Sequence, residues 1–528
     1  MPGSSPWATA SELWCRPSGI VKRPAQRHDN RPWLPAAFCQ GQPLRYNCRY
    51  VPDYCDNSSS SDRDRTLTSE GIPLIAEEAI GIDLREERLT GTILRLSAPL
   101  VAERLSTTAI GIVDTVLVGR YVGADGVAAI GIAGLLLWLP LSGAWGVNVG
   151  STVVVAHSAG ARALGDLQRA VRASLTFAFL WGLAVSLLLV ATANPLMHLM
   201  AARDNVIGEG VDYMRLTSLG MPCMAMMYAA NGCLRGVGNT RTPMLVIILA
   251  NVANGVIAFL LISGVFGLPK MGVSAAGVGT ASAGIVGAFV AVGVLVKGYG
   301  PILFRPLHAL RFGRTEARRL LNIAIPVGLE ELQFNLAFLF YSRLITAYGT
   351  AATAAYTISL RAVDIAQVPG FALGTAGTAV VGQSLGAGRP DLAVRTGKET
   401  RKWALITMVG LAVVVLVFAP QIVGLFVDDP AVIDIGSRCL RVFALAFPMM
   451  GMGTALSGTL RGAGDVRYVL GVLTVTAWTV RIPAAFFFSH VVGWGPAGAW
   501  VGAVLEQNVR AGLVWNRFAG GRWKTKRV

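Results

Sequence analysis

The sequence predicts an all-α polytopic membrane protein, with about twelve transmembrane helices in two pseudo-symmetric six-helix lobes. Its 528 residues are 53% hydrophobic and only 14% charged, and the mean hydropathy is +0.55. Soluble globular domains carry about 25% charged residues, so this composition is typical of a membrane protein. From residue 93 onward, long apolar segments alternate with short polar loops, and motifs of the first half return in the second.

Twelve segments are long enough for transmembrane helices, which need about 20 residues to cross a hydrocarbon core of about 30 Å. We expect them near residues 93–122, 126–157, 168–192, 206–234, 241–263, 273–297, 318–348, 351–384, 391–418, 432–460, 466–489 and 496–517. Every second loop is rich in Arg and Lys, whereas the loop 419–431 has neither. Cytoplasmic loops carry the basic excess, so we expect a protein of the cell (inner) membrane with both termini in the cytoplasm.

The chain outside the spans divides by composition. Residues 1–70 are rich in Arg, Pro, Ser and Asn and lack a long apolar segment. Because no methionine lies between Met1 and Met197, we expect a disordered leader or a translation start assigned too far upstream. The remaining boundaries that we expect are an amphipathic lead-in at 71–92, an N-lobe at 93–297, a cytoplasmic linker at 298–319, a C-lobe at 320–517 and a basic cytoplasmic tail at 518–528.

An internal repeat supports the two lobes. The stretch GCLRGVGNTRTP, which begins at residue 232, returns as GTLRGAGDVRYV from residue 458, and Pro99 with Glu103 returns as Pro326 with Glu330. Six spans per half are an even number, so the two halves have the same orientation in the membrane. Substrate sites of such repeats lie between the halves near the bilayer midplane.

The net charge of +16 does not indicate nucleic-acid binding, because the basic residues lie in loops beside apolar spans, where they set topology. The seven cysteines form no CxxC pair or Cys/His cluster, so we expect neither a metal site nor a disulfide framework. No Walker A, HExxH or GxSxG pattern is present. We therefore expect no enzyme activity and no cofactor, and an ion gradient as the energy source.

Charged residues inside a span are the first candidates for function. Glu103, Arg104 and Asp114 lie in the first apolar stretch, where a charge costs about 3 kcal/mol on insertion scales. Glu103 and Asp114 are about three helical turns apart and share a helix face with Thr107 between them. We interpret this acidic face as the cation-handling wall of a transporter cavity.

Several motifs resemble one transporter family in sequence and in order. They are VDTVLVGRYVG at 113–123, LRGVGNTRTP at 234–243, PGFALGTAGTAVVGQSLGAG at 369–388, TLRGAGD at 459–465, WTVRIP at 478–483 and RFAGGRWK at 517–524. From about residue 90 to its C-terminus, the chain resembles the multidrug and toxic compound extrusion (MATE) family, of the bacterial DinF-like or NorM-like kind. The resemblance implies two six-helix lobes and efflux of organic cations or other amphiphiles, driven by protons or sodium.

The resemblance also implies an N-lobe ion site. Asp114 matches an aspartate of the first helix that serves this site in the family, and Asn254 matches an asparagine of the fifth helix. A second aspartate of some members is Ala258 here, which leaves the coupling ion, H⁺ or Na⁺, and its stoichiometry open. Sodium needs several oxygen ligands, and Asn251 and Asn254 could supply carbonyls.

The second half offers further candidates, read from the residues alone. Glu330 and Glu331 are adjacent, so their side chains point about 100° apart and cannot both face one cavity squarely. Tyr341 is an aromatic candidate for the C-lobe cavity, and Asp364 is spaced for an ion pair with Arg361 within one helix. Arg481, just before Pro483, is expected to anchor the eleventh span.

Two functions remain open from the sequence. The first is a cation-coupled antiporter that exports organic cations or amphiphilic drugs, as a monomer among membrane lipids and without a nucleic-acid partner. The alternative is a lipid-linked precursor flippase of the same wider superfamily, which should carry an Arg-rich central cavity. The acidic residues at 103, 114, 330 and 331 favour cationic substrates.

Overall fold

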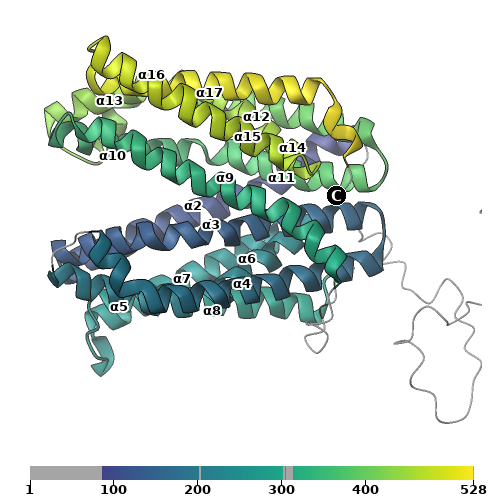
Figure 1. The fold of residues 1–528 in the computed structure, drawn as a ribbon, viewed down its shortest axis with the longest axis horizontal. Helices are drawn as coiled ribbons and strands as arrows, with labels where there is room; N and C mark the ends of the chain where they lie inside the picture. The colour runs from purple at the N-terminus through teal and green to yellow at the C-terminus, as the bar shows by residue number, and fades with distance from the viewer. Residues whose placement is uncertain are drawn as a thin grey trace, which may run out of the picture. The chain divides into compact units, whose positions relative to one another are not determined.

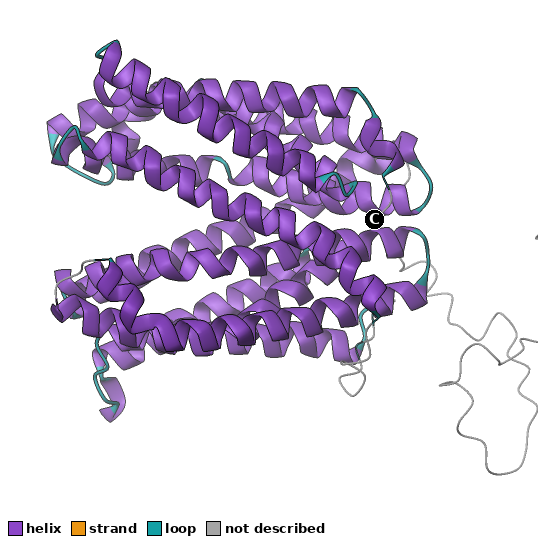
Figure 2. Ribbon diagram, viewed as in Figure 1, coloured by secondary structure: helices purple, strands orange, loops and turns teal. Residues whose placement is uncertain are grey.

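The computed structural model describes residues 82, 86–200, 204–300, 302, 304 and 313–526. They belong to one compact unit, Pro73–Val528, and are almost entirely helical (Figure 2). A single bridge between Tyr299 and Ile302 is the only β-type pairing among these residues. The expected leader at 1–70, most of the lead-in and residues 301, 303 and 305–312 of the linker lie outside the described residues.

The helices form two bundles that follow each other along the chain (Figure 1). The first bundle contains α2 (Leu89–Tyr121), α3 (Ala124–Gly160), α4 (Leu164–Leu199), α5 (Asp204–Leu219), α6 (Met221–Gly236), α7 (Arg241–Ser263) and α8 (Val273–Lys297). The second contains α9 (Arg314–Thr346), α10 (Thr350–Ala366), α11 (Val368–Gly386), α12 (Pro390–Gly424), α13 (Pro430–Ala444), α14 (Phe447–Gly462), α15 (Val466–Thr476), α16 (Ile482–Phe486) and α17 (Gly495–Ala519). The bounds of α7 and α8 coincide with the expected spans, and this architecture confirms the predicted all-α, two-lobe fold class.

Three expected spans consist of two helices each, which the periodicity of the sequence did not reveal. They are α5 with α6, α10 with α11, and α13 with α14; the last two pairs bend by 41° and 53°. The second helix of each pair begins with a proline in its first turn, namely Pro222, Pro369 or Pro448. Proline has no N–H to donate to the preceding turn but is tolerated at a helix start, so each break lies just before it.

Hydropathy alone finds fewer spans than the packing does. In the described part of the chain, seven helices are long and apolar enough to cross a membrane, or nine if each bent pair is one span. The other expected spans, α2, α5 with α6, and α17, carry charged residues such as Glu103, Arg235 and Glu506. These charges have partners on neighbouring helices, which lowers the free energy cost of placing them in the membrane.

The two halves repeat their packing contacts as well as their motifs. The hydroxyl of Thr152 on α3 donates to the carbonyl of Gly232 on α6 at 3.1 Å. In the second bundle, the hydroxyl of Thr378 on α11 donates to the carbonyl of Gly458 on α14 at 2.9 Å. Thr378 follows Thr152 at the same spacing at which Gly458 follows Gly232. The sequence repeat is therefore also a repeat of packing contacts.

A second repeated contact joins the bundles to each other. The ring of His157 on α3 bonds through Nε2 to the carbonyl of Gly462 on α14 at 2.9 Å. Its counterpart Gln383 on α11 donates through Nε2 to the carbonyl of Gly236 on α6 at 2.7 Å. We call these two contacts the cross-lobe bonds. Each bundle thus contributes one side chain and one carbonyl to its neighbour.

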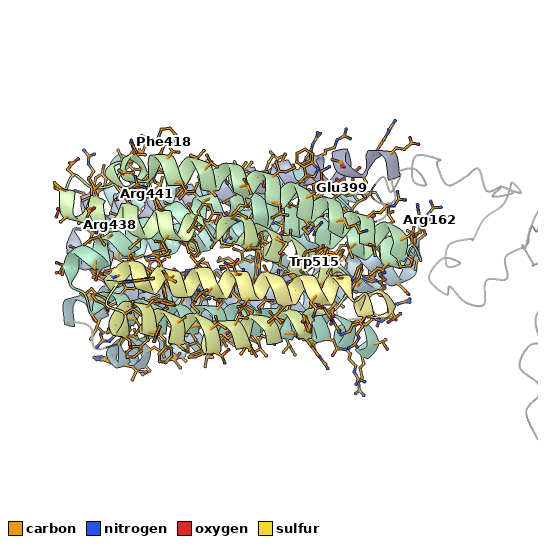
Figure 3. All side chains as sticks on the ribbon, turned by 90° about the horizontal axis from the view of Figure 1, so that it is seen from above. Arg162, Glu399, Phe418, Arg438, Arg441 and Trp515 are labelled. Atoms are coloured by element: carbon orange, nitrogen blue, oxygen red, sulfur yellow. The ribbon has the colours of Figure 1, made fainter. Side chains whose placement is uncertain are left out.

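The cross-lobe bonds depend on a close approach of α3 and α11. A Cβ at Gly160 would lie 2.1 Å from the carbonyl oxygen of Gln383, and a Cβ at Gly386 would lie 2.2 Å from that of His157. Only glycine fits at either position, because a Cβ would force the two backbones apart. Arg162, just beyond Gly160, lies at one end of the bundles, and Arg438 and Arg441 lie at the opposite end (Figure 3).

A buried carboxylate binds the end of α17 and the segment that follows it. Asp465, just before α15, has no exposed side-chain surface and accepts from Arg517 Nε at 2.7 Å and from Lys526 Nζ. The ring of Trp523 is fully buried and stacks on Phe518 with centroids 5.4 Å apart. The described part of the expected basic tail, 518–526, therefore packs on the second bundle.

Candidate functional site

The carboxylate of Asp114, in the last quarter of α2, is bound by a neutral partner from α7. Asn254 Nδ2 donates to Asp114 Oδ2 at 3.0 Å. The other carboxylate oxygen, Asp114 Oδ1, and the amide oxygen Asn254 Oδ1 are buried and have no hydrogen-bond partner among the described residues. No Lys or Arg of the described chain forms an ion pair with Asp114. The negative charge therefore has only an amide to stabilise it.

Helices α5 and α8 complete the surroundings of this pair. Tyr213 on α5 lies within electrostatic range of Asp114. Thr217 lies one turn further along α5, on the same face of that helix. Thr217 Oγ1 is a third buried oxygen without a partner. A Cβ at Gly279 of α8 would lie 2.5 Å from Asn254 Oδ1, so this glycine leaves room for the amide. Ala258, fully buried on α7, borders the same position and supplies no ligand.

These atoms can hold a proton or a monovalent cation. Carboxylate, amide and hydroxyl oxygens are hard ligands of the kind that alkali cations prefer, and a lone carboxylate is also a proton acceptor. In the described part of the chain, no group of three or more His, Cys, Asp and Glu side chains could hold a metal ion. The site thus offers one carboxylate with neutral neighbours.

Asn251 and Glu103, also predicted for this site, have other partners. Asn251 Nδ2 donates to Ser106 Oγ at 2.9 Å, which ties α7 to α2 two turns before Asp114. Glu103 forms an ion pair with Arg235 of α6. Arg235 Nη1 also donates to Asn148 Oδ1 at 3.1 Å, and only 4% of the Arg235 side chain is exposed. In the structure, Asn254 is thus a hydrogen-bond partner of Asp114, whereas Glu103 forms an ion pair with a buried arginine.

The same ion pair recurs in the second bundle. Glu330 of α9 pairs with Arg461 of α14, whose Nε lies 3.3 Å from Glu330 Oε2. Glu103 and Arg235 correspond to Glu330 and Arg461 in the internal repeat. Sequence reasoning did not identify Arg235 and Arg461 as the partners. A signal was available, since both arginines lie in the repeated motif LRG at 234–236 and 460–462.

The remaining C-lobe candidates do not gather into one cluster. Glu331 is within electrostatic range of Arg104 and Arg461. Asp364 lies exposed on α10 and accepts from Gln367 Nε2 at 3.1 Å. Tyr341 is fully buried inside the second bundle, where the guanidinium of Arg481 lies over its ring at 4.6 Å.

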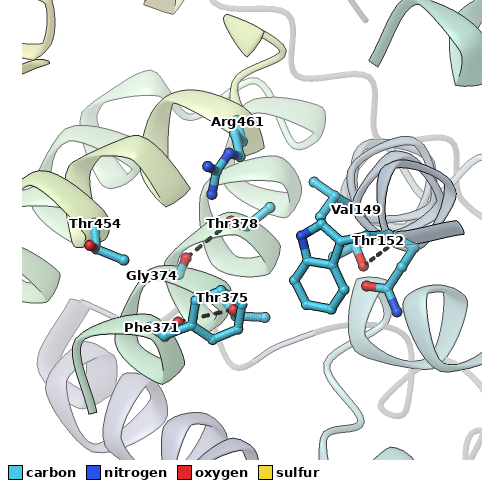
Figure 4. Close-up of a pocket in the computed structure, with 10 residues that line it drawn as sticks. Val149, Thr152, Phe371, Gly374, Thr375, Thr378, Thr454 and Arg461 are labelled. Carbon is cyan, nitrogen blue, oxygen red and sulfur yellow. Dashed lines mark hydrogen bonds between the residues drawn. The ribbon is translucent and has the colours of Figure 1, made fainter. Parts of the chain in front are cut away.

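A small pocket of about 20 Å³ lies where α3 meets α11 and α14 (Figure 4). The side chains of Val149 and Thr152 face those of Phe371, Thr378 and Arg461 across it (Figure 4). The rings of Trp145 and Phe371, which are counterparts in the repeat, lie with centroids 5.6 Å apart. Because equivalent residues of the two halves meet here, the pocket lies on the pseudo-symmetry axis. The guanidinium of Arg104 stacks on Phe371 at 5.1 Å.

Comparison with known proteins agrees with the fold and the repeat. The MatE family profile matches residues 99–260 and 326–487, so that it fits each half once. The probable multidrug resistance protein YoeA of Bacillus subtilis (strain 168) is 28% identical over 444 residues, which are 81% of this chain and 93% of that protein. The probable multidrug resistance protein NorM of Burkholderia mallei (strain ATCC 23344) is 31% identical over 445 residues, which are 80% and 91% of the two chains.

A solved structure of a MOP superfamily transporter from Pyrococcus furiosus shares the fold. Its TM-score is 0.78 at 22% sequence identity, and the match covers 85% of this chain and 99% of that one. The profile matches more than half of the present chain, in two repeats that coincide with the two bundles. The chain therefore belongs to the multidrug and toxic compound extrusion (MatE) family, a family of multi-pass membrane transporters rather than of enzymes.

Proposed function

We propose that the protein is a proton- or sodium-coupled antiporter that exports organic cations or amphiphilic drugs by alternating access. It acts as a monomer in the inner membrane, with both termini in the cytoplasm and no cofactor. The observation that carries this proposal is the carboxylate of Asp114, which lies within the apolar part of α2 with Asn254 as its hydrogen-bond partner and without a cationic one. A charge placed at that depth without a countercharge is costly unless an ion occupies the site.

Coupling follows from competition for one negative charge. A proton or a sodium ion bound to Asp114 neutralises its charge. The affinity for a cationic substrate that this charge attracts is then lower. Ala258 contributes no second carboxylate, so the site offers one elementary charge per transport cycle. Thr217 Oγ1 and Asn254 Oδ1 are the neutral oxygens that would serve a sodium ion.

Alternating access requires the bundles to separate where the cross-lobe bonds join them. These bonds lie at the ends of α3 and α11 that precede the Arg-rich loops, hence at the cytoplasmic end in the expected topology. They are few and involve two side chains, so breaking them costs about 1 kcal/mol each. We call the interface that the cross-lobe bonds form the cytoplasmic seam. Because it is held by few bonds, it can form and break in each transport cycle.

The test is efflux of an ethidium-like cation from vesicles under an imposed proton gradient and, separately, under a sodium gradient. The proposal expects uptake or release of the dye under at least one gradient, and the gradient that works identifies the coupling ion. A chain that moves no cationic or amphiphilic dye under either gradient would contradict the proposal. Heat-treated vesicles serve as the control for leakage.

The charges near the central pocket disfavour the flippase alternative. A pyrophosphate-bearing lipid needs a surplus of arginines, because each phosphate brings negative charge. Arg461 at the pocket is paired with Glu330, and Arg104 is within range of Glu331. The arginines are thus balanced by carboxylates, which favours cationic or neutral amphiphiles.

Gly279→Ala is expected to lower gradient-driven efflux about tenfold without loss of folded protein. The new Cβ would lie 2.5 Å from Asn254 Oδ1, so the amide must turn away from Asp114. The measurement is initial dye efflux at equal protein level. Gly293→Ala on the same helix is the matched control, because a Cβ there meets nothing within 4 Å. Equal efflux for both variants would contradict the role of Asn254.

Gly160→Ala is expected to open the cytoplasmic seam, because its Cβ would meet the Gln383 carbonyl at 2.1 Å. Thiol labelling of an introduced Ser384→Cys, which is buried beside Gln383, should become several-fold faster from the cytoplasmic side. Gly131→Ala on the same helix is the control, since a Cβ there has open space. Unchanged labelling would show that the seam does not depend on this close approach.

A further inference from the structure

Arg481 is a buried arginine in the C-lobe that has no anionic partner. It ends a short π-helical turn, Ala477–Arg481, and only 7% of its surface is exposed. No carboxylate in the described part of the chain forms an ion pair with it, and its Nε has no hydrogen-bond partner. Glu506, the acidic residue of α17, uses its Oε1 for Thr476 at 3.2 Å and Arg510 at 3.8 Å, while its Oε2 is buried without a hydrogen-bond partner.

Its surroundings add further unused hydrogen-bond donors. Tyr341 lies under the guanidinium at 4.6 Å, its ring is 6.0 Å from that of Tyr356, and Tyr356 is 5.7 Å from Trp500. The hydroxyls of Tyr341 and Tyr356 and the indole N–H of Trp500 are all buried without a partner. The exposed fractions of these three residues are 0%, 5% and 1%. Four polar side chains, each in contact with the next, thus present unsatisfied groups, although more than nine-tenths of buried polar groups are normally bonded.

The internal repeat shows what this position corresponds to. Tyr341 follows Asp114, and Arg481 follows Asn254, at the spacing that separates the two profile matches, which is one residue more than the spacing of the motif at 232 and 458. The first half therefore has a carboxylate and an amide, while the second half has a phenol and a guanidinium on the corresponding helices. The charge of the site is inverted between the lobes. A π-helical turn at Arg481 fits a functional position, since such turns recur at functional sites.

A cation–π contact with Tyr341 does not compensate for burying this charge. Such a contact is weaker than the desolvation penalty of an unpaired buried ion. An anion beside the guanidinium would supply the missing countercharge, and the phenol and indole donors would complete its shell. Because the four residues are at most 7% exposed, an anion enclosed by them must be small.

We propose that the C-lobe holds a binding site for a small monovalent anion, a halide or a carboxylate group, formed by Arg481, Tyr341, Tyr356 and Trp500. The site is separate from the cation site at Asp114 and goes beyond the antiport function. Binding is measured without any ion gradient, so its failure would leave the proposed antiport unaffected.

The test is the unfolding temperature of the full-length protein in detergent, titrated with sodium chloride and, separately, with sodium formate. Sodium gluconate keeps the sodium concentration constant, because gluconate is too large for the site. The wild type is expected to show a saturable rise with at least one small anion. A response to chloride identifies a free halide as the occupant, and a response to formate alone identifies a carboxylate-bearing ligand. No saturable response to either anion would overturn the proposal.

Arg481→Gln is expected to weaken the apparent anion affinity at least about tenfold, and Arg481→Lys should restore part of it because the charge returns without the planar fork. Arg438→Gln, an exposed arginine of the same lobe paired with Asp434 at 2.8 Å, is the matched control and should respond like the wild type. If Arg481→Gln only lowers the unfolding temperature by the same amount in every salt, the arginine is structural and the site is refuted.

Isosteric variants cover the case in which Arg481→Gln fails to fold. Tyr341→Phe and Trp500→Phe keep most of the aromatic packing and remove one unsatisfied donor each. Each is expected to reduce the apparent affinity for the anion several-fold. Wild-type affinity in both variants would exclude these donors from the shell and overturn the site as proposed.

Discussion

Asp114→Asn is expected to insert and fold like the wild type but to lose gradient-driven efflux of a cationic dye down to the leak level. The substitution keeps the shape and removes the charge, so neither a proton nor a sodium ion is bound in exchange for substrate. Asn254 can still bond to the new amide, because the present contact of 3.0 Å uses only one of its groups. Removing a charge from the mid-span does not weaken insertion.

The measurement is efflux from vesicles under a proton gradient and then under a sodium gradient, at matched protein level. Substrate binding without a gradient should persist, which separates loss of coupling from loss of fold. Asp434→Asn is the control, since this carboxylate is exposed and pairs with Arg438. Full transport by Asp114→Asn under either gradient would contradict an ion site at Asp114 and would make Glu330 and Glu331 the next candidates.

Glu103→Gln is expected to destabilise the folded protein by about 3 kcal/mol, with a smaller effect on transport than Asp114→Asn. Its loss leaves Arg235 buried, with 4% of the side chain exposed and only Asn148 as a polar partner. Breaking a buried ion pair costs more than the pair contributes, because the remaining charge stays desolvated. Unfolding in detergent at increasing denaturant concentration measures the difference.

The repeat supplies the comparison for this prediction. Glu330→Gln removes the corresponding carboxylate but leaves Arg461 21% exposed at the pocket, in range of Glu331. We expect a smaller loss there, about 1.5 kcal/mol. The double variant Glu103→Gln with Arg235→Gln should recover part of the lost stability, because no unpaired charge remains. A single variant as stable as the wild type would show that water reaches Arg235.

The sequence by itself determined the fold class and the repeat, and it singled out Asp114 as the first candidate for an ion site. Long apolar segments fix the helices, because in a bilayer the backbone must bond within each segment. The returning motifs at 232 and 458 fixed the two halves, and Asp114 stood out because an idle mid-span carboxylate is costly. Each of these features lies within a short stretch of sequence, so it can be recognised without knowing which helices pack together.

Only the tertiary structure decided which partner each charged residue has. Glu103 was expected beside the cation site, but it pairs with Arg235. Arg481, expected to anchor the eleventh span, lies over Tyr341 without a carboxylate. These partners lie more than a hundred residues apart in the sequence, and helix packing at small residues such as Gly160 and Gly386 sets which faces meet. Hydropathy and spacing describe one helix at a time, and so they cannot tell which two faces come together.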